Sequence, residues 1–151
     1  MHSSSLLSRR ALPLLACVVL AGLLFGCIAD RPSVKWSLTG TVWKMVELNG
    51  EVVASNQLPS LSLDPTSHLV SGMAGVNRLS GTYAQNGAAL TFGALATTKM
   101  AGPADQMKLE QHYLAALGRV TAWKIEGQWL ELFADKTEVA RFQGLPAGAP
   151  L

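Results

Sequence analysis

The stretch Ser71–Tyr83, which reads SGMAGVNRLSGTY, is the part of the sequence that decides the fold. Its first residues continue a strand predicted over 68–73, and its last residues begin another predicted over 79–84. The glycines and the asparagine between them are typical of a turn or a bulge. A hairpin signal, Gln85-Asn86-Gly87, then separates the second strand from a third over 89–92. The centre of the chain is therefore predicted as consecutive antiparallel strands.

Short strands are predicted on both sides of this centre, at the spacing of hairpins. The strongest hairpin signal in the chain is Asn49-Gly50. The outer predicted strands cover residues 41–48, 51–53, 61–63, 120–125, 129–133 and 137–142. One helix interrupts them, with Pro103 placed for its first turn and Gly118 for its end. The apolar face predicted for this helix consists of Met107, Tyr113, Leu114 and Leu117, with Leu109 and Ala116 on its edge.

The fold class that follows is mostly β with one helix (α+β). An open meander of about eight short strands would leave two long edges exposed, and closure of the sheet removes them. We therefore expect a small antiparallel β-barrel-like meander, plugged or flanked by the helix.

Composition excludes several classes of function. The chain has 151 residues, enough for one domain of ordinary size, and 49% of them are hydrophobic while 15% are charged. It carries 12 Lys and Arg against 10 Asp and Glu, and removal of Arg9 and Arg10 with the apolar run that follows them leaves 10 against 10. A nucleic-acid-binding protein needs a basic face to displace counterions. We therefore expect no nucleic-acid partner.

The N-terminus has the organisation of a bacterial signal peptide. Residues 11–29 form an uncharged run of 19 residues that follows two arginines. Near its end, Leu24-Phe25-Gly26-Cys27 resembles the lipobox, in which the cysteine receives a diacylglycerol and, after cleavage before it, an acyl group on its new amine. Several acyl chains hold a domain stably on a membrane without any helix. The alternative is an uncleaved N-terminal anchor helix.

These signals divide the chain into four parts. We expect a signal peptide over 1–26, acylated Cys27 with a tether over 27–38, a folded domain over 39–143 and a flexible tail over 144–151. Trp36 lies in this tether, where its amphipathic ring could meet lipid headgroups or a partner. Ile28 follows the cysteine where an Asp would favour inner-membrane retention in enteric bacteria, so we expect the outer membrane, with the domain facing the periplasm.

The central stretch and two that follow it resemble the META/HslJ-like domain family. The family pattern is roughly G-x-x-G-C-N-R-(aromatic)-S-G-x-Y, then L-x-F-G, then A-S-T-R-M-A-C, and a helix carrying a Glu follows. The corresponding stretches here are Ser71–Tyr83, Leu90–Gly93 and Leu95–Met100. The resemblance covers nearly the whole mature chain and implies a small β-barrel-like domain in the bacterial cell envelope. Its relatives are linked to heat shock, novobiocin tolerance and secretion or motility phenotypes, with no agreed molecular activity.

Val76 and Gly102 stand where this family usually has cysteines. The resemblance implies that the two cysteines form a disulfide in relatives, so positions 76 and 102 are expected to face each other. Such a bond contributes about 2–4 kcal/mol, which this chain must obtain from packing. Lys99 replaces a usual Arg and lacks its bidentate fork, which weakens any anion-binding role of this loop.

The candidate site residues are Asn77, Arg78, Thr98 and Lys99. One interpretation makes them a polar binding site at the rim of the sheet. The other is structural: Asn77 bonds backbone groups in a turn or bulge, and Arg78 pairs with a carboxylate. We favour the structural interpretation, under which Arg78→Ala leaves an uncompensated charge and costs several kcal/mol.

No constellation in the sequence indicates an enzyme, a metal site or a cofactor. The histidines outside the signal peptide, His68 and His112, are far apart, no His or Cys pair has zinc-ligand spacing, and there is no nucleophile elbow. We expect a non-enzymatic envelope lipoprotein that acts through protein contacts in envelope maintenance or in stress or antibiotic tolerance. The alternative is a barrel-type binding module for a small apolar ligand. The small residues that would leave room for that ligand, or simply allow tight packing, are Gly81, Ala84, Ala88 and Ala89.

Overall fold

The computed structural model describes residues 34–55 and 57–146. The strands are β1 (Val42–Leu48), β2 (Glu51–Val52), β3 (Ser60–Leu63), β4 (Leu69–Met73), β5 (Arg78–Asn86), β6 (Ala89–Phe92), β7 (Ala96–Thr97), β8 (Ala122–Glu126), β9 (Trp129–Ala134) and β10 (Thr137–Leu145). The one helix in these ranges is α1 (Ala104–Leu117). The prediction of a mostly antiparallel β fold with a single helix is confirmed, and only the short β7 has no predicted counterpart.

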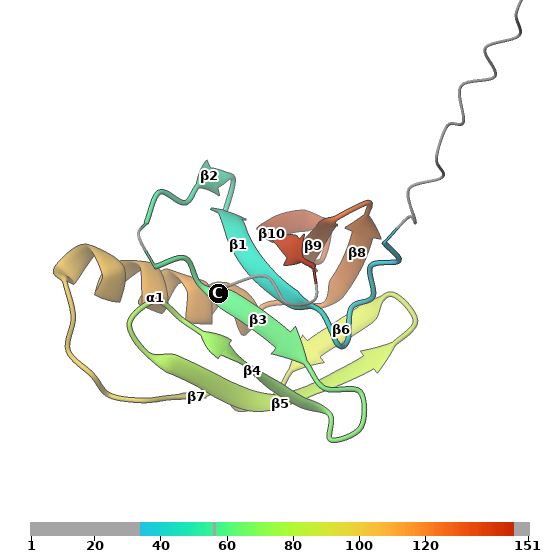
Figure 1. The fold of residues 1–151 in the computed structure, drawn as a ribbon, viewed down its shortest axis with the longest axis horizontal. Coiled ribbons are helices and arrows are strands. Elements are labelled where there is room, and N and C mark those ends of the chain that lie inside the picture. The colour runs from blue at the N-terminus through green and yellow to red at the C-terminus, as the bar shows by residue number, and fades with distance from the viewer. Residues whose placement is uncertain (1–33, 56, 147–151) are drawn as a thin grey trace, which may run out of the picture. The chain divides into compact units, whose positions relative to one another are not determined.

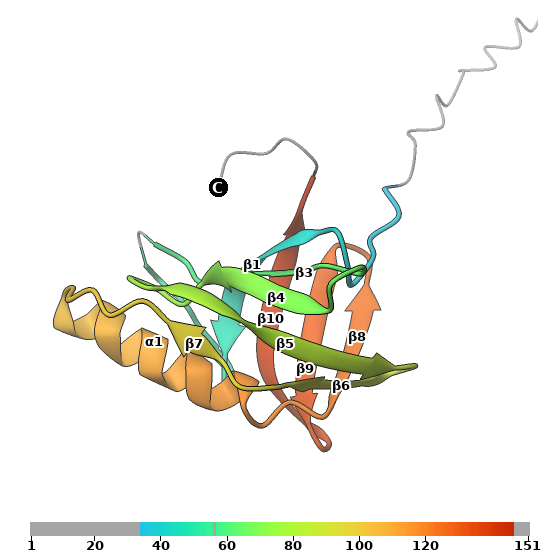
Figure 2. The ribbon, with the colours of Figure 1, turned by 90° about the horizontal axis from the view of Figure 1, so that it is seen from below.

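The strands form one antiparallel sheet that closes on itself. Its order is β10-β9-β8-β6-β5-β4-β3-β1-β2, and an additional pairing of β10 with β1 joins the path into a ring. The short strands β2 and β7 lie off this ring, because β2 pairs with β1 and β7 with β5. Figures 1 and 2 show the ring from two directions, with α1 on the opposite side from the blue start of the described chain.

The ring is closed unevenly. β1 and β10 pair from one end of β1 to the other, whereas β6 and β8 share the single residue pair Ala89↔Ala122. A hydrogen bond from Trp123 N–H to Ala88 O (3.0 Å) supports this second join. We call the narrow join of β6 and β8 the seam.

The Asn49-Gly50 turn joins β1 to β2, as predicted. Both residues have positive φ, 51° at Asn49 and 83° at Gly50. A type I′ hairpin turn requires this backbone at both central positions. Glycine adopts it without steric cost, and asparagine is one of the few other residues that tolerate it.

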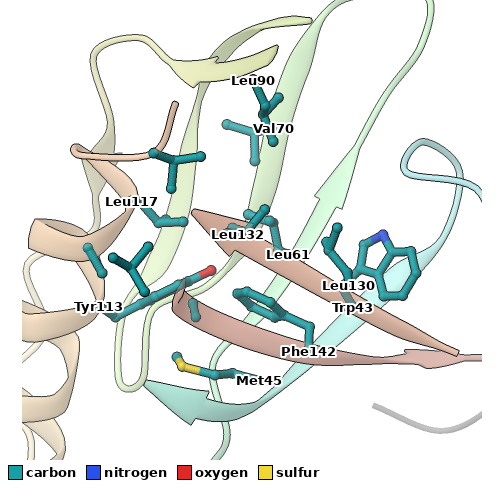
Figure 3. Packing of buried hydrophobic residues seen from close by; sticks show 14 of the residues in the cluster. Trp43, Met45, Leu61, Val70, Leu90, Tyr113, Leu117, Leu130, Leu132 and Phe142 are labelled. Atoms are coloured by element: carbon teal, nitrogen blue, oxygen red, sulfur yellow. The ribbon is translucent and has the colours of Figure 1, made fainter. Parts of the chain in front are cut away.

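The interior of the ring is filled by side chains of the chain itself (Figure 3). The fully buried residues include Trp43, Met45, Leu61, Val70, Leu90, Leu117, Leu130, Leu132 and Phe142. Tyr113 of α1 reaches among them, with its ring centroid 6.2 Å from that of Phe142. The indole Nε1 of Trp43 donates to Leu38 O at 3.0 Å, so this buried polar atom has a partner.

The small residues of β5 and of the β5–β6 hairpin do not open a space inside the ring. Ala84, Ala88 and Ala89 are exposed. Gly81 lies against the segment before β7, where an added Cβ would be 2.8 Å from Ala94 O. Tight packing therefore holds for Gly81 alone, and the three exposed alanines fit neither alternative.

Helix α1 begins directly after Pro103 and ends directly before Gly118, so both residues mark its limits as the sequence indicated. The side chains that it buries are Glu110, Tyr113, Ala116 and Leu117. Met107 and Leu114, which the sequence placed on the apolar face, are only partly buried. Compared with the predicted apolar face, the face that α1 buries is therefore rotated around the helix so that it includes an acidic residue, Glu110.

The folded domain extends beyond its predicted limits at both ends. The ring centroid of Trp36 lies 6.1 Å from that of Trp43, and Trp36 fills the space that a Cβ at Gly144 would need. At the other end, β10 continues to Leu145, inside the predicted tail. Trp36 is therefore a packed residue of the domain and does not lie free in the tether.

The predicted signal peptide over 1–26 and Cys27 lie outside the described residues, as does the end of the tail over 147–151. Within the ranges that the structure covers, no helix has both the length and the apolar character needed to span a bilayer.

The turn between β3 and β4 is built around Asp64. Its Oδ1 accepts hydrogen bonds from the backbone N–H groups of Thr66 (2.9 Å) and Ser67 (2.7 Å) and from the Ser67 hydroxyl (3.0 Å). The Ser67 backbone bond is the main cause that lowers the pKa of Asp64 below its ordinary value of 3.8. A carboxyl with a lowered pKa stabilises the fold above its unfolded pKa, and this contribution is lost as the pH falls through the folded pKa.

We expect Asp64→Asn to make the free energy of unfolding less dependent on pH below about pH 4. The amide also accepts these hydrogen bonds more weakly than the carboxylate, so the variant is less stable at neutral pH. Denaturant unfolding at a series of pH values measures both effects. Asp135→Asn, in the exposed turn between β9 and β10, is the matched control. A pH profile of Asp64→Asn identical to that of the parent would contradict this role for the turn.

Candidate functional site

The candidate site lies where the corner between β4 and β5 meets α1 and the segment that carries β7. Leu79 of β5 pairs with Thr97 of β7. Next to this pair, Thr98 N–H donates to Arg78 O at 3.1 Å. The two stretches that the sequence treats as parts of one rim therefore lie side by side.

Asn77 is the centre of this site and is only 1% exposed. Its Nδ2 donates to the two carboxylate oxygens of Glu110, at 2.9 and 3.1 Å, and to Met100 O at 3.2 Å. Its backbone N–H donates to Glu110 Oε2 at 3.0 Å. Its Oδ1 accepts from the Thr98 hydroxyl at 2.8 Å and from Met100 N–H at 2.7 Å. One side chain thus holds α1 and the segment after β7 against the β4–β5 corner.

Glu110 is a buried carboxylate, 5% exposed, on the inner face of α1. None of the ion pairs within the described ranges includes it. Its charge is therefore compensated by hydrogen bonds from Asn77 and not by a cation. Gly75 permits this close approach: its φ is 139°, and an added Cβ would lie 3.3 Å from Gln106 O. A residue with a side chain at 75 would be strained and would press on the helix.

Arg78 does not make the carboxylate pair that the structural interpretation predicted. Its side chain is exposed, and it takes part in none of the ion pairs among the residues described. Successive residues of an extended chain point to opposite faces, so Asn77 and Arg78 cannot both reach Glu110. The carboxylate belongs to Asn77, and the buried pair on which the expected cost of Arg78→Ala depended is absent among the described residues.

Like Asn77 and Arg78, Thr98 and Lys99 differ in whether the side chain takes part in the hydrogen-bond network. The Thr98 hydroxyl accepts from Arg78 N–H at 3.1 Å and donates to Asn77 Oδ1, so it closes the network. Lys99 is exposed. The structure brings all four candidate residues to one corner, but only the side chains of Asn77 and Thr98 are bonded to each other. Arg78 and Lys99 present their cations to solvent.

The hydrogen bonds of Asn77 define what this site can do. An asparagine side chain has two N–H donors and two acceptor lone pairs, and protein groups occupy all of them here. The site is therefore built as a junction between elements. No group of three or more His, Cys, Asp or Glu side chains in the described ranges is placed to hold a metal ion.

Glu110 is the site residue that reasoning from the sequence missed. It lies 33 positions after Asn77, and no local pattern links the two. The family pattern could have indicated Glu110, because that pattern includes a helix with a glutamate and Glu110 is the one glutamate of α1.

The hollows of the surface lie outside the ring. One of about 400 Å³ separates Val52 of β2 from His112 of α1. A second, of about 550 Å³, is bounded by Trp36 and Trp123. A third, of about 270 Å³, has Lys44 at its edge. The interior side chains labelled in Figure 3 line none of these three hollows.

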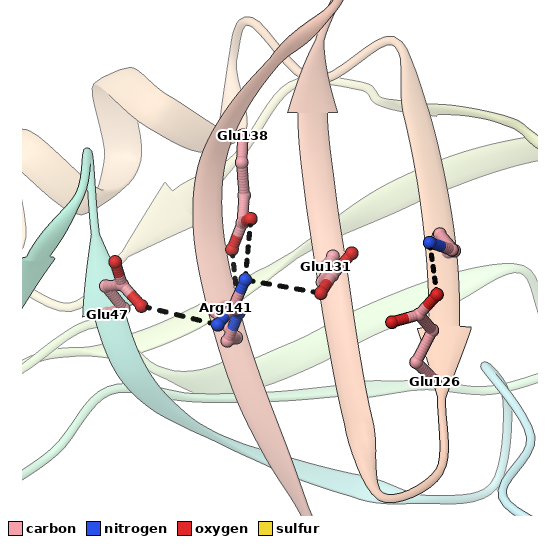
Figure 4. A network of polar contacts seen from close by, with 6 residues as sticks. Glu47, Glu126, Glu131, Glu138 and Arg141 are labelled. Carbon is pink, nitrogen blue, oxygen red and sulfur yellow. Dashed lines mark hydrogen bonds and ion pairs between the residues drawn. The ribbon is translucent and has the colours of Figure 1, made fainter.

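The outer face of β1, β10 and β9 carries a second polar cluster, centred on Arg141 (Figure 4). Its guanidinium donates to both carboxylate oxygens of Glu138 at 2.9 Å and lies 3.3 Å from Glu131 and 3.8 Å from Glu47. The hydrogen bond to Glu138 is the main cause that raises the pKa of Arg141. Solvent-exposed ion pairs contribute about 0–1 kcal/mol each. The cluster therefore shapes the charge of the outer face more than the stability of the fold.

Comparison with known proteins identifies the family of this chain and shows solved structures with a similar fold. The model of the META domain family matches residues 36–146. An NMR structure of a protein from Burkholderia xenovorans is similar over 72% of this chain and 83% of its own, with 26% identity and a TM-score of 0.59. A second NMR structure is similar over 72% of this chain and 96% of its own, with 20% identity and a TM-score of 0.55, which shows the fold alone. No curated protein matched the sequence.

Proposed function

The chain belongs to the META domain family, and from this premise we propose that it is a non-enzymatic lipoprotein of the bacterial cell envelope. Acyl chains on Cys27 hold it on the outer membrane, with the domain facing the periplasm. It acts through protein contacts, in envelope maintenance or in stress or antibiotic tolerance, and uses no cofactor.

The observation that carries a contact-based function is the filled interior of the ring. A ring of this size holds a small ligand only when its inward side chains leave room. Here Trp43, Tyr113, Phe142 and the leucines around them are fully buried against one another. This packing speaks against the alternative function, a small apolar ligand held inside the ring. The outer surface is the part of the domain that remains for recognition.

Anchoring through Cys27 is supported by the sequence that surrounds it. The residues before it form an apolar run long enough for a signal peptide, and the residues after it include a proline and two serines before Leu38. Stable attachment by lipid alone takes more than one acyl chain, and a lipobox cysteine carries its acyl groups on both the thiol and the amine.

We expect the full chain to incorporate labelled palmitate in a bacterial host, and Cys27→Ser to abolish both the label and the membrane attachment. Cys17→Ser is the matched control, because Cys17 lies within the apolar run and should be removed with it. Gel fluorography and membrane fractionation measure the two effects. A parent protein that stays on the membrane without label would show instead that the apolar run is a retained helix.

Capture of the acylated protein from envelope membranes tests how it acts. We expect an envelope protein to be recovered together with the unmodified acylated chain. Recovery of that partner should be lost in variants that alter the outer surface of the domain without unfolding it. A small apolar molecule recovered in equal molar amount with the purified chain would instead support the alternative function, the binding module. Mass spectrometry of the same sample distinguishes the two results.

A further inference from the structure

The hollow of about 550 Å³ lies where the described chain begins. The segment around Trp36, the β5–β6 turn at Gly87 and the strand β8 at Trp123 form its walls. It borders the seam, where β6 and β8 share one residue pair. Figures 1 and 2 show the blue start of the described residues beside β8, on the side of the ring away from α1.

Three apolar side chains, those of Val34, Trp36 and Trp123, lie at this end of the domain. Trp36 and Trp123 are partly buried and line the hollow. The Trp123 indole N–H donates to Gly87 O at 3.0 Å, so its polar atom is satisfied. Val34 is 58% exposed at the start of the segment. Indole rings favour the boundary between water and lipid, because they are apolar with one polar edge.

The length of chain between Cys27 and the domain limits how this end can be oriented. Val34 lies seven positions after Cys27, and seven steps of extended chain span at most about 24 Å. Because Trp36 packs on Trp43, the folded domain begins earlier than predicted, and fewer residues join it to Cys27 than the predicted tether over 27–38 contains. An acylated Cys27 therefore keeps the Trp36 end of the domain close to lipid.

We propose that this end of the domain rests on the membrane surface, with Val34, Trp36 and Trp123 at the level of the lipid headgroups. The proposal rests on the acylation of Cys27 proposed above. Charge contributes little to the contact, since the nearby cations are Lys35 and Lys124, and Lys124 is paired with Glu126. The contact should therefore depend weakly on salt and on anionic lipid.

Quenching of tryptophan fluorescence by brominated phospholipid tests this contact. The full acylated chain is placed in vesicles of phosphatidylethanolamine and phosphatidylglycerol, with and without bromine on the acyl chains. The triple variant Trp36→Phe, Trp123→Phe, Trp129→Phe keeps only Trp43, which is fully buried and sets the background. Variants that keep Trp36 or Trp123 in addition should show a blue shift on vesicles and a bromine-dependent loss of intensity beyond that background.

An exposed charge provides a second test that does not disturb packing. Val34→Glu should reduce the quenching of Trp36, whereas Val52→Glu should not, because Val52 is 82% exposed on β2, which lies away from the blue start of the described residues. Palmitate label is measured on the same samples. A labelled protein whose Trp36 and Trp123 signals equal the Trp43 background would overturn the membrane contact and leave acylation intact. Equal effects of the two glutamates would also overturn it, and a protein without label would overturn both proposals.

Discussion

Replacement of Asn77 by alanine is expected to lower the free energy of unfolding by about 3–4 kcal/mol. The change removes the side-chain hydrogen bonds to Glu110, Thr98 and Met100 at once. It leaves the Glu110 carboxylate buried with the backbone N–H of residue 77 as its remaining donor from this position. A domain of this size has a total stability of about 5–15 kcal/mol, so the variant should be close to unfolding at moderate temperature. Thermal and denaturant unfolding followed by circular dichroism measure the loss.

Arg78→Ala is the matched control for this prediction, because it changes the adjacent residue, whose side chain is exposed. We expect it to change stability by no more than about 0.5 kcal/mol. The double variant Asn77→Ala, Glu110→Ala should lose less than the sum of the two single variants, since it removes the unpaired carboxylate as well. Additive losses would show that the two side chains do not depend on each other, and a larger loss at Arg78 than at Asn77 would reverse the assignment.

A disulfide between positions 76 and 102 is expected to raise the melting temperature by about 15 °C. The expectation that these positions face each other is confirmed by the structure, because a Cβ added at Gly102 would lie 3.2 Å from the Cβ of Val76. Disulfides require a Cβ–Cβ distance of about 3.5–4.5 Å, which a small shift of the exposed Gly102 segment provides. Closing the loop of residues 76–102 contributes about 3.5 kcal/mol in the entropic model. The double variant Val76→Cys, Gly102→Cys should lose two hydrogens by mass and part of its stability in reductant.

The single variants separate the bond from its steric effects. Gly102→Cys alone should be destabilised, because its Cβ would be 2.4 Å from Val76 Cγ2. Val76→Ala with Gly102→Ala opens the same space without a link, and the melting temperature of the disulfide variant is compared with it. Free thiols in the folded double variant would contradict the contact between these two segments.

Features that depend on neighbours in the sequence could be predicted from it. The turn at Asn49-Gly50 follows from the residues that tolerate positive φ. The helix limits follow from Pro103 and Gly118, which favour the first turn and the end of a helix. Alternation of apolar and polar residues located the strands of the ring, because it reports which face of a strand is buried.

Features that depend on distant residues could not be predicted in the same way. The pattern around Asn77 and Arg78 shows two polar residues in a turn, and only the position of α1 decides which of them meets Glu110. Trp36 looked like a tether residue because its partners, Trp43 and Gly144, come together only when β1 pairs with β10. The two-residue strand β7 is too short to have a periodicity. It forms because its backbone pairs with the first part of β5.

The pairing of β1 with β10 also determines when, during synthesis, this protein can finish folding. β1 is the first strand and β10 the last, and their register joins Val42 to Leu145. Closing so long a stretch of chain costs more entropy than closing a hairpin, and such contacts form slowly. Until β10 has emerged from the ribosome or the translocation channel, β1 lacks a partner on that side and the ring cannot shut. A chain that crosses a membrane unfolded, as the proposed signal peptide requires, thus remains competent for export until nearly all of it has been made.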